Sequence, residues 1–236
     1  MVVMKFGGTS VADRAAIERL MAIVRAERQA EAQRESGDAR GPIVVVSALS
    51  GVTDRLLGVA AQAGAGDAEG ARSSLRELHE RHVTVSEVIV DDDLRASTRE
   101  AMARDVGELE RIVLALSVLR EVSPRWMDTV AAAGEVLSSR LVAAALTSHG
   151  LPAAWVDARL AVVTDGEHQA AAPQFTETTA ALVAQVDPVL ASGRIPVLGG
   201  FVGATRDGVT TTLGRGGSDY SAAIVGACLG VAEIQV

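Results

Sequence analysis

Two short runs of apolar, mostly β-branched residues, at 2–6 and 43–47, constrain the fold more than any other feature of this sequence. Each run ends at a loop of glycine or small residues, and neither alternates with polar residues. Such continuous runs are typical of strands buried on both faces of a parallel sheet. Residues 11–35 between them carry apolar side chains at helical spacing. The sequence therefore predicts a β-α-β unit with a right-handed crossover.

The rest of the chain divides into a helical part and a mixed part. Residues 54–150 carry almost no strand signal, and strand signals return after Gly150. A hairpin is predicted over 202–213, with its turn at 206–208. The predicted helices of the first part are around 71–90, 98–120 and 126–149, and the other predicted strands are 153–156, 160–163, 195–198 and 232–236.

The composition agrees with an α/β fold. Hydrophobic residues make up 48% of the chain but aromatic residues only 3%, so the core must be built from Ala, Val, Leu and Ile. This suits helices packed on a buried parallel sheet better than an all-β sandwich. We predict a mainly parallel central sheet with helices on both faces, a three-layer sandwich formed by one domain over residues 1–236.

Charge and cysteine content exclude several classes of protein. The net charge is −8 and no basic block is present, which argues against a nucleic-acid partner. The single cysteine, Cys228, lies in an apolar stretch and is interpreted as a small buried residue. No apolar run approaches the ~20 residues that span a bilayer. We therefore expect a cytoplasmic protein with neither a membrane nor a nucleic acid as partner.

Lys5 is the only lysine, and every other basic residue of this size is arginine. It follows an apolar run, and a single residue separates it from Gly7 and Gly8. An ammonium is a compact point charge, whereas a guanidinium is a planar fork. A site that places one positive charge between phosphate oxygens, beside backbone N–H groups exposed at glycine, can require the first and exclude the second. The alternative is a leftover lysine at a solvated N-terminus.

Four loops of glycine and small residues follow predicted strands, at 7–10, 48–53, 199–201 and 214–219. In open α/β sheets, ligands bind outside the carboxyl ends of the strands, so these loops are expected to share one cleft. The last loop contains Arg215 among three glycines, and its arginine fork suits a carboxylate. The alternative for this loop is a flexible turn with an exposed arginine.

Two common nucleotide-binding templates are absent from the sequence. No G-x-G-x-x-G opens a helix after the first strand, so the dinucleotide-binding fingerprint is missing. No G-x-x-x-x-G-K-[ST] exists, because the only lysine is Lys5, so the chain has no P-loop. If a nucleotide binds here, it does so by another arrangement of glycine loops.

Glu135 stands among small residues on the helix predicted over 126–149. A carboxylate buried there needs a cationic partner, and the ammonium of a substrate is one candidate. A solvated helix face or an ion pair with Arg140 is the alternative. Two further groups receive structural interpretations: the acidic run 91–93 is interpreted as a solvated turn, and His79 and His82 as surface residues.

Taken together, four motifs resemble the aspartokinases, the aspartate-using branch of the amino acid kinase superfamily. The resemblance extends over essentially the whole chain, and the first and last of the motifs are the most specific. The motifs are K-F-G-G-T-S-V at 5–11, V-S-A at 46–48 with Thr53, G-E at 134–135, and T-T-L-G-R-G-G-S-D at 211–219.

The resemblance implies an activity and a set of roles. The implied reaction is ATP-dependent phosphorylation of the L-aspartate β-carboxylate to 4-phospho-L-aspartate, the first step toward lysine, threonine, methionine and diaminopimelate. ATP is the implied phosphoryl donor, with Mg²⁺ held mainly by phosphates and water and by no protein cage. The implied catalytic residues are Lys5 and Asp219. The implied phosphate-binding residues are Lys5, Phe6, Gly7, Gly8 and Gly214, and the implied substrate-binding residues are Ser47, Thr53, Glu135, Arg215, Gly216, Gly217 and Ser218.

The resemblance also bears on the extent of the protein. In the family, adenine-binding elements and regulatory domains follow the strand that corresponds to 232–236, and the full-length protein is expected to be a homodimer. We therefore expect an incomplete catalytic domain that binds aspartate weakly and ATP negligibly by itself. The alternatives are another superfamily kinase, acting on glutamate, acetylglutamate or UMP, and a non-catalytic module. Arg215 with Glu135 favours an amino-acid zwitterion over a uridylate.

Overall fold

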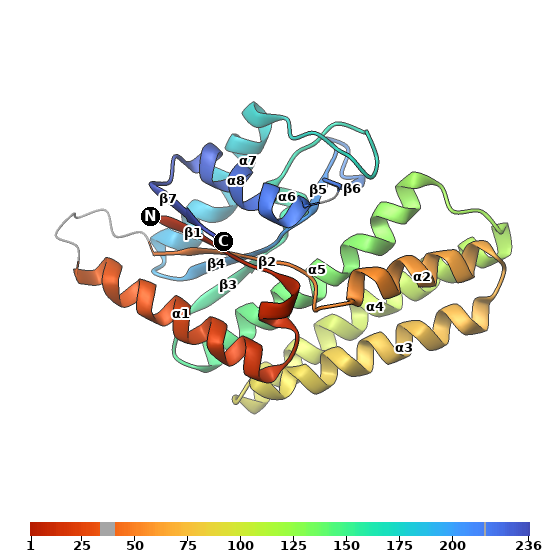
Figure 1. The fold of residues 1–236 in the computed structure, drawn as a ribbon, viewed down its shortest axis with the longest axis horizontal. Helices are drawn as coiled ribbons and strands as arrows, with labels where there is room; N and C mark the ends of the chain where they lie inside the picture. The colour runs from red at the N-terminus through yellow and green to blue at the C-terminus, as the bar shows by residue number, and fades with distance from the viewer. Residues whose placement is uncertain (34–40, 215) are drawn as a thin grey trace.

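A five-stranded, fully parallel sheet forms the centre of the molecule (Figure 1). The computed structural model describes residues 1–33, 41–214 and 216–236. The strand order is β3-β4-β2-β1-β7. The strands are β1 (Val2–Phe6), β2 (Ile43–Val46), β3 (Ala153–Val156), β4 (Ile195–Gly199) and β7 (Glu233–Gln235).

Helices cover both faces of the sheet, which confirms the predicted α/β class. On one face α1 (Arg14–Gln33) and α5 (Pro124–Ser148) lie below the strands in Figure 1, and on the other lie α7 (Phe175–Ala191) and α8 (Gly217–Leu229). Alternate residues of β2 enter the two cores, because successive side chains of a strand point to opposite faces. Val44 packs in the core with α1 and α5, and Val45 in the core with α7 and α8.

A helical bundle extends beside the sheet (Figure 1). It consists of α2 (Val52–Gly64), α3 (Ala68–Val85), α4 (Asp92–Leu119) and the first half of α5, with two 3₁₀ turns, η1 (Gly8–Val11) and η2 (Ser86–Val88), at its base. The sequence did not predict α2. Its buried residues Val52, Leu56, Val59 and Ala63 do recur at helical spacing, so the signal was present in the sequence. This apolar face packs against α3, α4 and α5.

The strand predicted at 160–163 is wrong. Ala158–Ala161 forms the short helix α6, whose first turn is capped by Asp157: its carboxylate accepts a hydrogen bond from Arg159 N at 3.0 Å. The two valines that follow lie outside the helix: Val162 is extended, and Val163 forms an isolated parallel bridge with Ala204. The predicted hairpin is confirmed, because β5 (Val202–Ala204) and β6 (Thr210–Thr212) pair antiparallel.

The placement of His82 on the surface is also wrong. Its side chain is fully buried, and Nδ1 contacts Leu78 O at 2.8 Å. Burial lowers the pKa of His82 from 6.5 to about 4, because removing the ring from water disfavours its charged form. His79 is half-buried. The charged neighbours on α3 hid the apolar face to which these rings belong.

Two other predictions concern the ends of elements. Asp91 caps α4, since its carboxylate accepts a hydrogen bond from Leu94 N at 2.8 Å. The strand predicted at the end of the chain forms, but β7 pairs only with β1 and lies at the edge of the described sheet, so its predicted central position is wrong here. Helix α5 is long and apolar enough to cross a membrane by length and composition, and 83% of its most apolar window is buried in the fold.

Candidate active site

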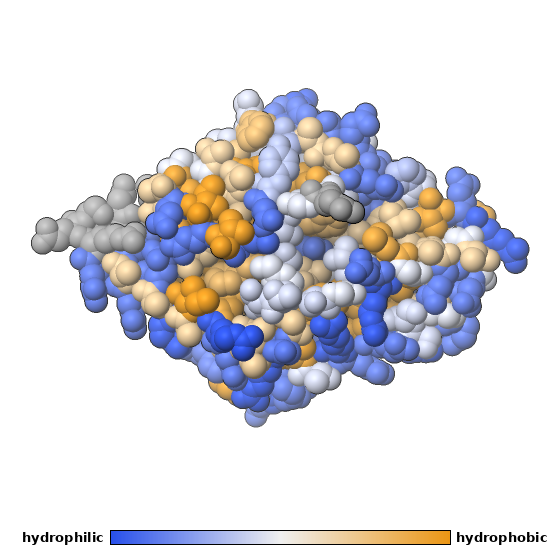
Figure 2. Space-filling model, viewed as in Figure 1, coloured by the Kyte–Doolittle hydropathy of each residue, from blue (hydrophilic) through white to orange (hydrophobic). Residues whose placement is uncertain are grey.

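A cavity of about 940 Å³ opens at the carboxyl edge of β1, β2 and β4. In Figure 2, a strip of pale residues of intermediate hydropathy runs down the middle of the view, with apolar and polar surface on both sides of it. The loops that follow these strands meet there, as the sequence predicted. The sequence-predicted residues that line the cavity are Lys5, Gly8, Ser47, Thr53, Glu135, Gly214, Gly216, Gly217, Ser218 and Asp219.

Lys5 projects from β1 into this cavity. Its side chain is only 12% exposed, and its ammonium forms an ion pair with Asp219, whose own side chain is 57% exposed. A β-carbon built at Gly7 would lie 3.6 Å from the ammonium nitrogen, so the glycine keeps the space beside the charge open. The positive charge is therefore held at the wall of the cavity by a carboxylate that faces solvent.

Gly8 brings the first loop against the loop that follows β2. Gly8 O accepts a hydrogen bond from Ser50 N at 3.1 Å, and a β-carbon at Gly8 would lie 3.0 Å from Ala48 O. A side chain at this position would push the two loops apart. Glycine is thus required here for close approach of two backbones, which also keeps Ser47 beside β1 through the 3.0 Å bond from Ser47 N to Phe6 O.

Glu135 lies on α5 and forms part of the cavity lining. The residue is 3% exposed, and Oε1 accepts one hydrogen bond, from Ala48 N at 3.2 Å. Within the described residues Oε2 is buried and has no hydrogen-bond partner. Burial raises the pKa of Glu135 from 4.5 to about 8, since few donors offset the loss of water. This carboxylate therefore has one oxygen available to a cationic ligand.

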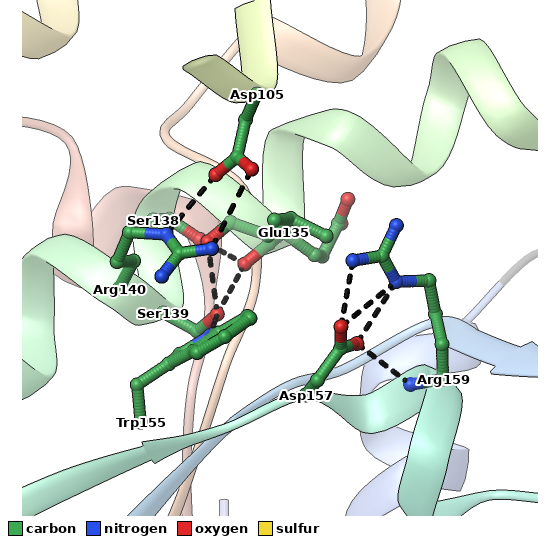
Figure 3. Close-up of polar contacts among 9 residues, drawn as sticks. Asp105, Glu135, Ser138, Ser139, Arg140, Trp155, Asp157 and Arg159 are labelled. Carbon is green, nitrogen blue, oxygen red and sulfur yellow. Dashed lines mark hydrogen bonds and ion pairs between the residues drawn. The ribbon is translucent and has the colours of Figure 1, made fainter. Parts of the chain in front are cut away.

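The alternatives considered for Glu135 are wrong. The residue is not on a solvated face, and Arg140 pairs instead with Asp105, Nε to Oδ2 at 3.0 Å. The Arg140 guanidinium also stacks over the Trp155 ring, 3.7 Å from its centroid (Figure 3). Trp155 Nε1 donates a hydrogen bond to Ser139 Oγ at 2.9 Å, so this cluster occupies Arg140 completely without involving the Glu135 carboxylate.

The last glycine loop forms the N-terminus of α8. Gly214 and Gly216 adopt left-handed backbone with φ of 77° and 75°, which favours glycine. A β-carbon at Gly217 would lie 2.7 Å from Phe201 Cδ2, so a side chain would be excluded by the neighbouring loop. The backbone N–H groups at the start of a helix suit an anion. Arg215, predicted to bind the substrate carboxylate, lies outside the described residues.

Two predicted phosphate-binding residues do not line the cavity. The Phe6 side chain is buried in the hydrophobic core, and its carbonyl is bonded to Ser47 N. Gly7 lies between Lys5 and Gly8 without itself contributing to the lining. Both residues support the loop geometry, and neither presents a side chain to a ligand.

A second group of residues lines the cavity and was not predicted from the sequence. Asp128, Gln169 and Thr212 line the cavity and are joined by hydrogen bonds, and Leu57 and Met127 add an apolar wall. Asp128 precedes Glu135 by two helical turns, so helical spacing places both on one face of α5. That spacing was the available signal. Gln169 carried none, because it is brought to the site by a long connection between α6 and α7.

No group of three His, Cys, Asp or Glu that could hold a metal ion occurs in the described parts of the chain. The titratable groups that face the cavity are Lys5, Asp54, Asp128, Glu135 and Asp219. The arrangement combines one largely buried cation, the N-terminus of α8 and one buried carboxylate with an unpaired oxygen. It can bind a ligand that carries both an anionic group and an ammonium.

Comparison with known proteins agrees with this arrangement. The sequence profile described as "Amino acid kinase family" matches residues 1–236. Lysine-sensitive aspartokinase 3 of Escherichia coli is 30% identical over 241 residues, which cover 100% of this chain and 48% of that protein. Bifunctional aspartokinase/homoserine dehydrogenase 1 of Arabidopsis thaliana is 30% identical, over 94% of this chain and 23% of that protein.

A solved structure shares the fold. The crystal structure of E. coli aspartokinase III in complex with aspartate and ADP, in its R-state, superposes with a TM-score of 0.85 and 29% identity, over 99% of this chain and 48% of that chain. The chain thus spans about half the length of the E. coli relative and about a quarter of the Arabidopsis one.

Proposed function

This chain belongs to the amino acid kinase family, and we propose that it is the catalytic part of an aspartate kinase. In this proposal, ATP donates its γ-phosphoryl group to the β-carboxylate of L-aspartate, and the product is 4-phospho-L-aspartate. The reaction would be the first step of lysine, threonine, methionine and diaminopimelate biosynthesis. The relatives named above support this assignment, and so does a site with complementary charges for an amino acid. The homodimeric state and the cytoplasmic location stay predictions.

The observation that carries the proposal is the half-satisfied carboxylate of Glu135. One of its oxygens is bonded to Ala48 N, and the other is buried without a partner at the cavity. A buried carboxylate without a compensating donor is costly, and a bound ammonium would remove that cost. The α-amino group of aspartate supplies this ammonium, which a uridylate lacks. Glu135 therefore favours an amino acid as the phosphoryl acceptor.

The chemistry requires little from the protein beyond alignment and charge. The β-carboxylate of aspartate has an unperturbed pKa of ~3.9, so at neutral pH it is ionised and needs no general base. The carboxylate oxygen attacks the γ-phosphorus, the bond to the bridging oxygen breaks, and ADP leaves with the electron pair. Lys5 would neutralise charge that spreads over the phosphoryl oxygens. The N–H groups of the glycine loops would hold those oxygens in line.

The donor set of the cavity also fits a nucleotide that brings its own cation. Lys5, Asp54, Asp219 and the glycine N–H groups line the site without a cage of three carboxylates among the described residues. Mg²⁺ retains several waters and commonly binds through one or two carboxylates plus substrate phosphates. When bound with ATP, the cation would offset the negative charge of the phosphates, and Asp219 is the carboxylate nearest to Lys5.

A phosphoryl-acceptor screen tests the proposal. The full-length protein that contains this chain is purified and incubated with ATP–Mg²⁺ and one acceptor, and hydroxylamine traps any acyl phosphate as a coloured hydroxamate. We expect product with L-aspartate and much less with L-glutamate or N-acetyl-L-glutamate, and ADP release is measured in parallel with UMP as acceptor. Glu135→Gln, which keeps the shape of the side chain, is the matched control for amine recognition. Preferred turnover of an acceptor that has no free amine would overturn the proposal.

A further inference from the structure

Asp128 is a second buried carboxylate on the same helix face as Glu135, but its oxygens are fully engaged. The residue is 0% exposed. Oδ1 accepts from Thr212 Oγ1 at 2.6 Å, Oδ2 contacts His168 Nδ1 at 2.7 Å, and Gln169 N lies 3.1 Å from both oxygens. One side chain thus joins α5 to two other segments, the 165–174 connection and the end of β6.

Both segments lead into the wall of the cavity. Ala171 N donates to Thr212 O at 3.0 Å, which ties the connection to β6 a second time. Gln169 has a left-handed backbone, with φ of 69°, and a β-carbon at Gly214 would lie 2.9 Å from Gln169 O. The carbonyl of Gln169 therefore packs against the first residue of the glycine loop that opens α8. Displacing Gln169 would move this contact.

A role in stability alone does not explain a carboxylate at this position. Replacing a buried charged group and its partners by well-packed apolar residues is often neutral or stabilising, so the charge is weak support for the fold itself. What Asp128 supplies is geometry. Its oxygens fix the backbone of Gln169 and the side chain of Thr212 at a set distance from α5, two turns from Glu135 on that helix.

We propose that Asp128 is a positioning residue that holds Gly214, through Gln169, in register with Glu135, so that the anion-binding and ammonium-binding parts of the amino-acid site keep the correct separation. This inference rests on the proposed function. Asp128 acts through Gln169 and Thr212, because its own oxygens are already occupied. Its loss would loosen amino-acid binding, whereas Gly8 lies in a separate loop and would keep its hydrogen bond from Ser50 N.

Two variants of Asp128 separate the loss of its hydrogen-bond acceptors from the loss of its charge. In Asp128→Asn the amide oxygen can still accept from Thr212 and Gln169, and the new amide can donate to His168 when the imidazole carries its proton on the other nitrogen. Asp128→Ala removes every acceptor. Asp157→Asn is the matched control, because Asp157 is a mostly buried carboxylate that pairs with Arg159 but lies outside the lining of the large cavity.

The experiment uses full-length proteins that contain this chain, and it measures two quantities for each: the dissociation constants for L-aspartate and for ADP–Mg²⁺ by calorimetry, and amide hydrogen exchange without ligand. For Asp128→Ala we expect about a tenfold or greater loss of aspartate affinity, with ADP affinity changed less than about twofold. Peptides that contain residues 168–171 and 213–219 should exchange faster. Asp128→Asn should recover most of both properties, and Asp157→Asn should resemble the wild type.

Several results would overturn the inference. One is unchanged aspartate affinity in Asp128→Ala, and another is an equal loss of affinity for both ligands. If Asp128→Ala fails to fold, Thr212→Val, which removes one donor at constant shape, should give the same effects in weaker form, and normal aspartate affinity in that variant contradicts the inference. A wild-type protein that binds no aspartate would refute the proposed function, while the exchange data would still decide whether Asp128 holds the loop.

Discussion

Two buried carboxylates on α5 differ in how many hydrogen bonds they accept. At Asp128 both oxygens accept hydrogen bonds, from donors in the 165–174 connection and in β6. At Glu135 one oxygen accepts a single bond from Ala48 N, and the other has no partner among the described residues. Both residues are buried and both line the same cavity. The difference lies in how many hydrogen-bond donors the surrounding chain supplies to each carboxylate.

This difference indicates which carboxylate serves the fold and which serves a ligand. Hydrogen bonds to an ionised group offset much of its loss of solvation, so Asp128 can be buried with the protein alone. Glu135 is poorly compensated, and its pKa is raised to about 8 by burial. A carboxylate held in this condition becomes favourable only when a cation enters. The predictions below test this contrast, starting with the largest expected effect.

Glu135→Ala should weaken amino-acid binding most. Removing one partner of a buried charge pair costs about 2–5 kcal/mol, so the aspartate KM should rise steeply while the ATP KM changes little. Steady-state kinetics with each substrate varied in turn gives both values. Asp105→Ala is the control, because Asp105 is a partly buried carboxylate beside α5 that pairs with Arg140 instead. An equal rise in KM for both substrates would indicate general damage to the fold, and the contrast between Glu135 and Asp128 would not hold.

Lys5→Arg should be nearly as damaging as Lys5→Met. Lys5 is paired with Asp219, but that partner is more than half exposed, so the ammonium stays available to phosphate oxygens. The guanidinium fork does not fit a point-charge site beside Gly7, and loss of one charge-stabilising group costs roughly 10²–10³ in kcat. Turnover at saturating substrates measures the effect. Retention of most activity by Lys5→Arg would eliminate the assigned role of Lys5.

Glu135→Gln should stabilise the ligand-free protein at alkaline pH. Because the folded-state pKa is raised from 4.5 to about 8, the contribution of Glu135 to stability is present below pH 4.5 and is lost as the pH rises through 8. The neutral amide avoids this loss, which we expect to be about 1–3 kcal/mol. Urea unfolding at pH 5 and pH 8.5 gives the difference between the two proteins. The same difference at both pH values would mean that Glu135 is not protonated in the free site.

His82 supplies a contrast away from the cavity. It also has a buried ring nitrogen without a partner in the described structure, yet it is not among the residues that line the cavity. Its pKa is lowered by burial from 6.5 to about 4, so the unfolded chain takes up a proton first and stability falls as the pH drops from 6.5 toward 4. In His82→Leu the free energy of unfolding should therefore fall less between pH 6.5 and pH 4, by on the order of 1–2 kcal/mol.

Denaturant titrations at pH 4.5, 5.5 and 7 test the His82 prediction, with the wild-type protein as the comparison. Aspartate affinity should be unaffected by His82→Leu, because an unsatisfied buried atom marks a ligand site only where a cavity reaches it. Reduced aspartate binding in this variant would show that the criterion applied to Glu135 does not separate ligand sites from the core.

Much of the site was accessible from the sequence because it depends on local chemistry. The isolated Lys5, the small residues around Glu135 and the glycines at 214–217 were identified from their neighbours, and most of them line one cavity. The resemblance to aspartokinases rested on the same residues and agrees with the family of the chain. Parallel pairing of β1 with β2 also followed from the apolar runs and the helix between them.

Other features could not be predicted because long-range contacts decide them. Strand β7 lies at the edge of the described sheet because it pairs only with β1, and Gln169 reaches the cavity because its backbone N–H donates to Asp128. The burial of His82 depends on helices that lie on either side of α3 in the fold. These outcomes depend on packing partners that no local window of sequence contains.

The sequence by itself determined the α/β class, the glycine loops at the strand ends and the charges that face one another across the cavity. Only the tertiary structure decided how far each charge is satisfied. Asp128 and Glu135 are the same kind of group on one helix face, and nothing in their local sequence separates them. The connection at 165–174 brings donors to the first and none to the second. Solvation of a buried charge is a sum over neighbours in space, so its value is set when the chain folds.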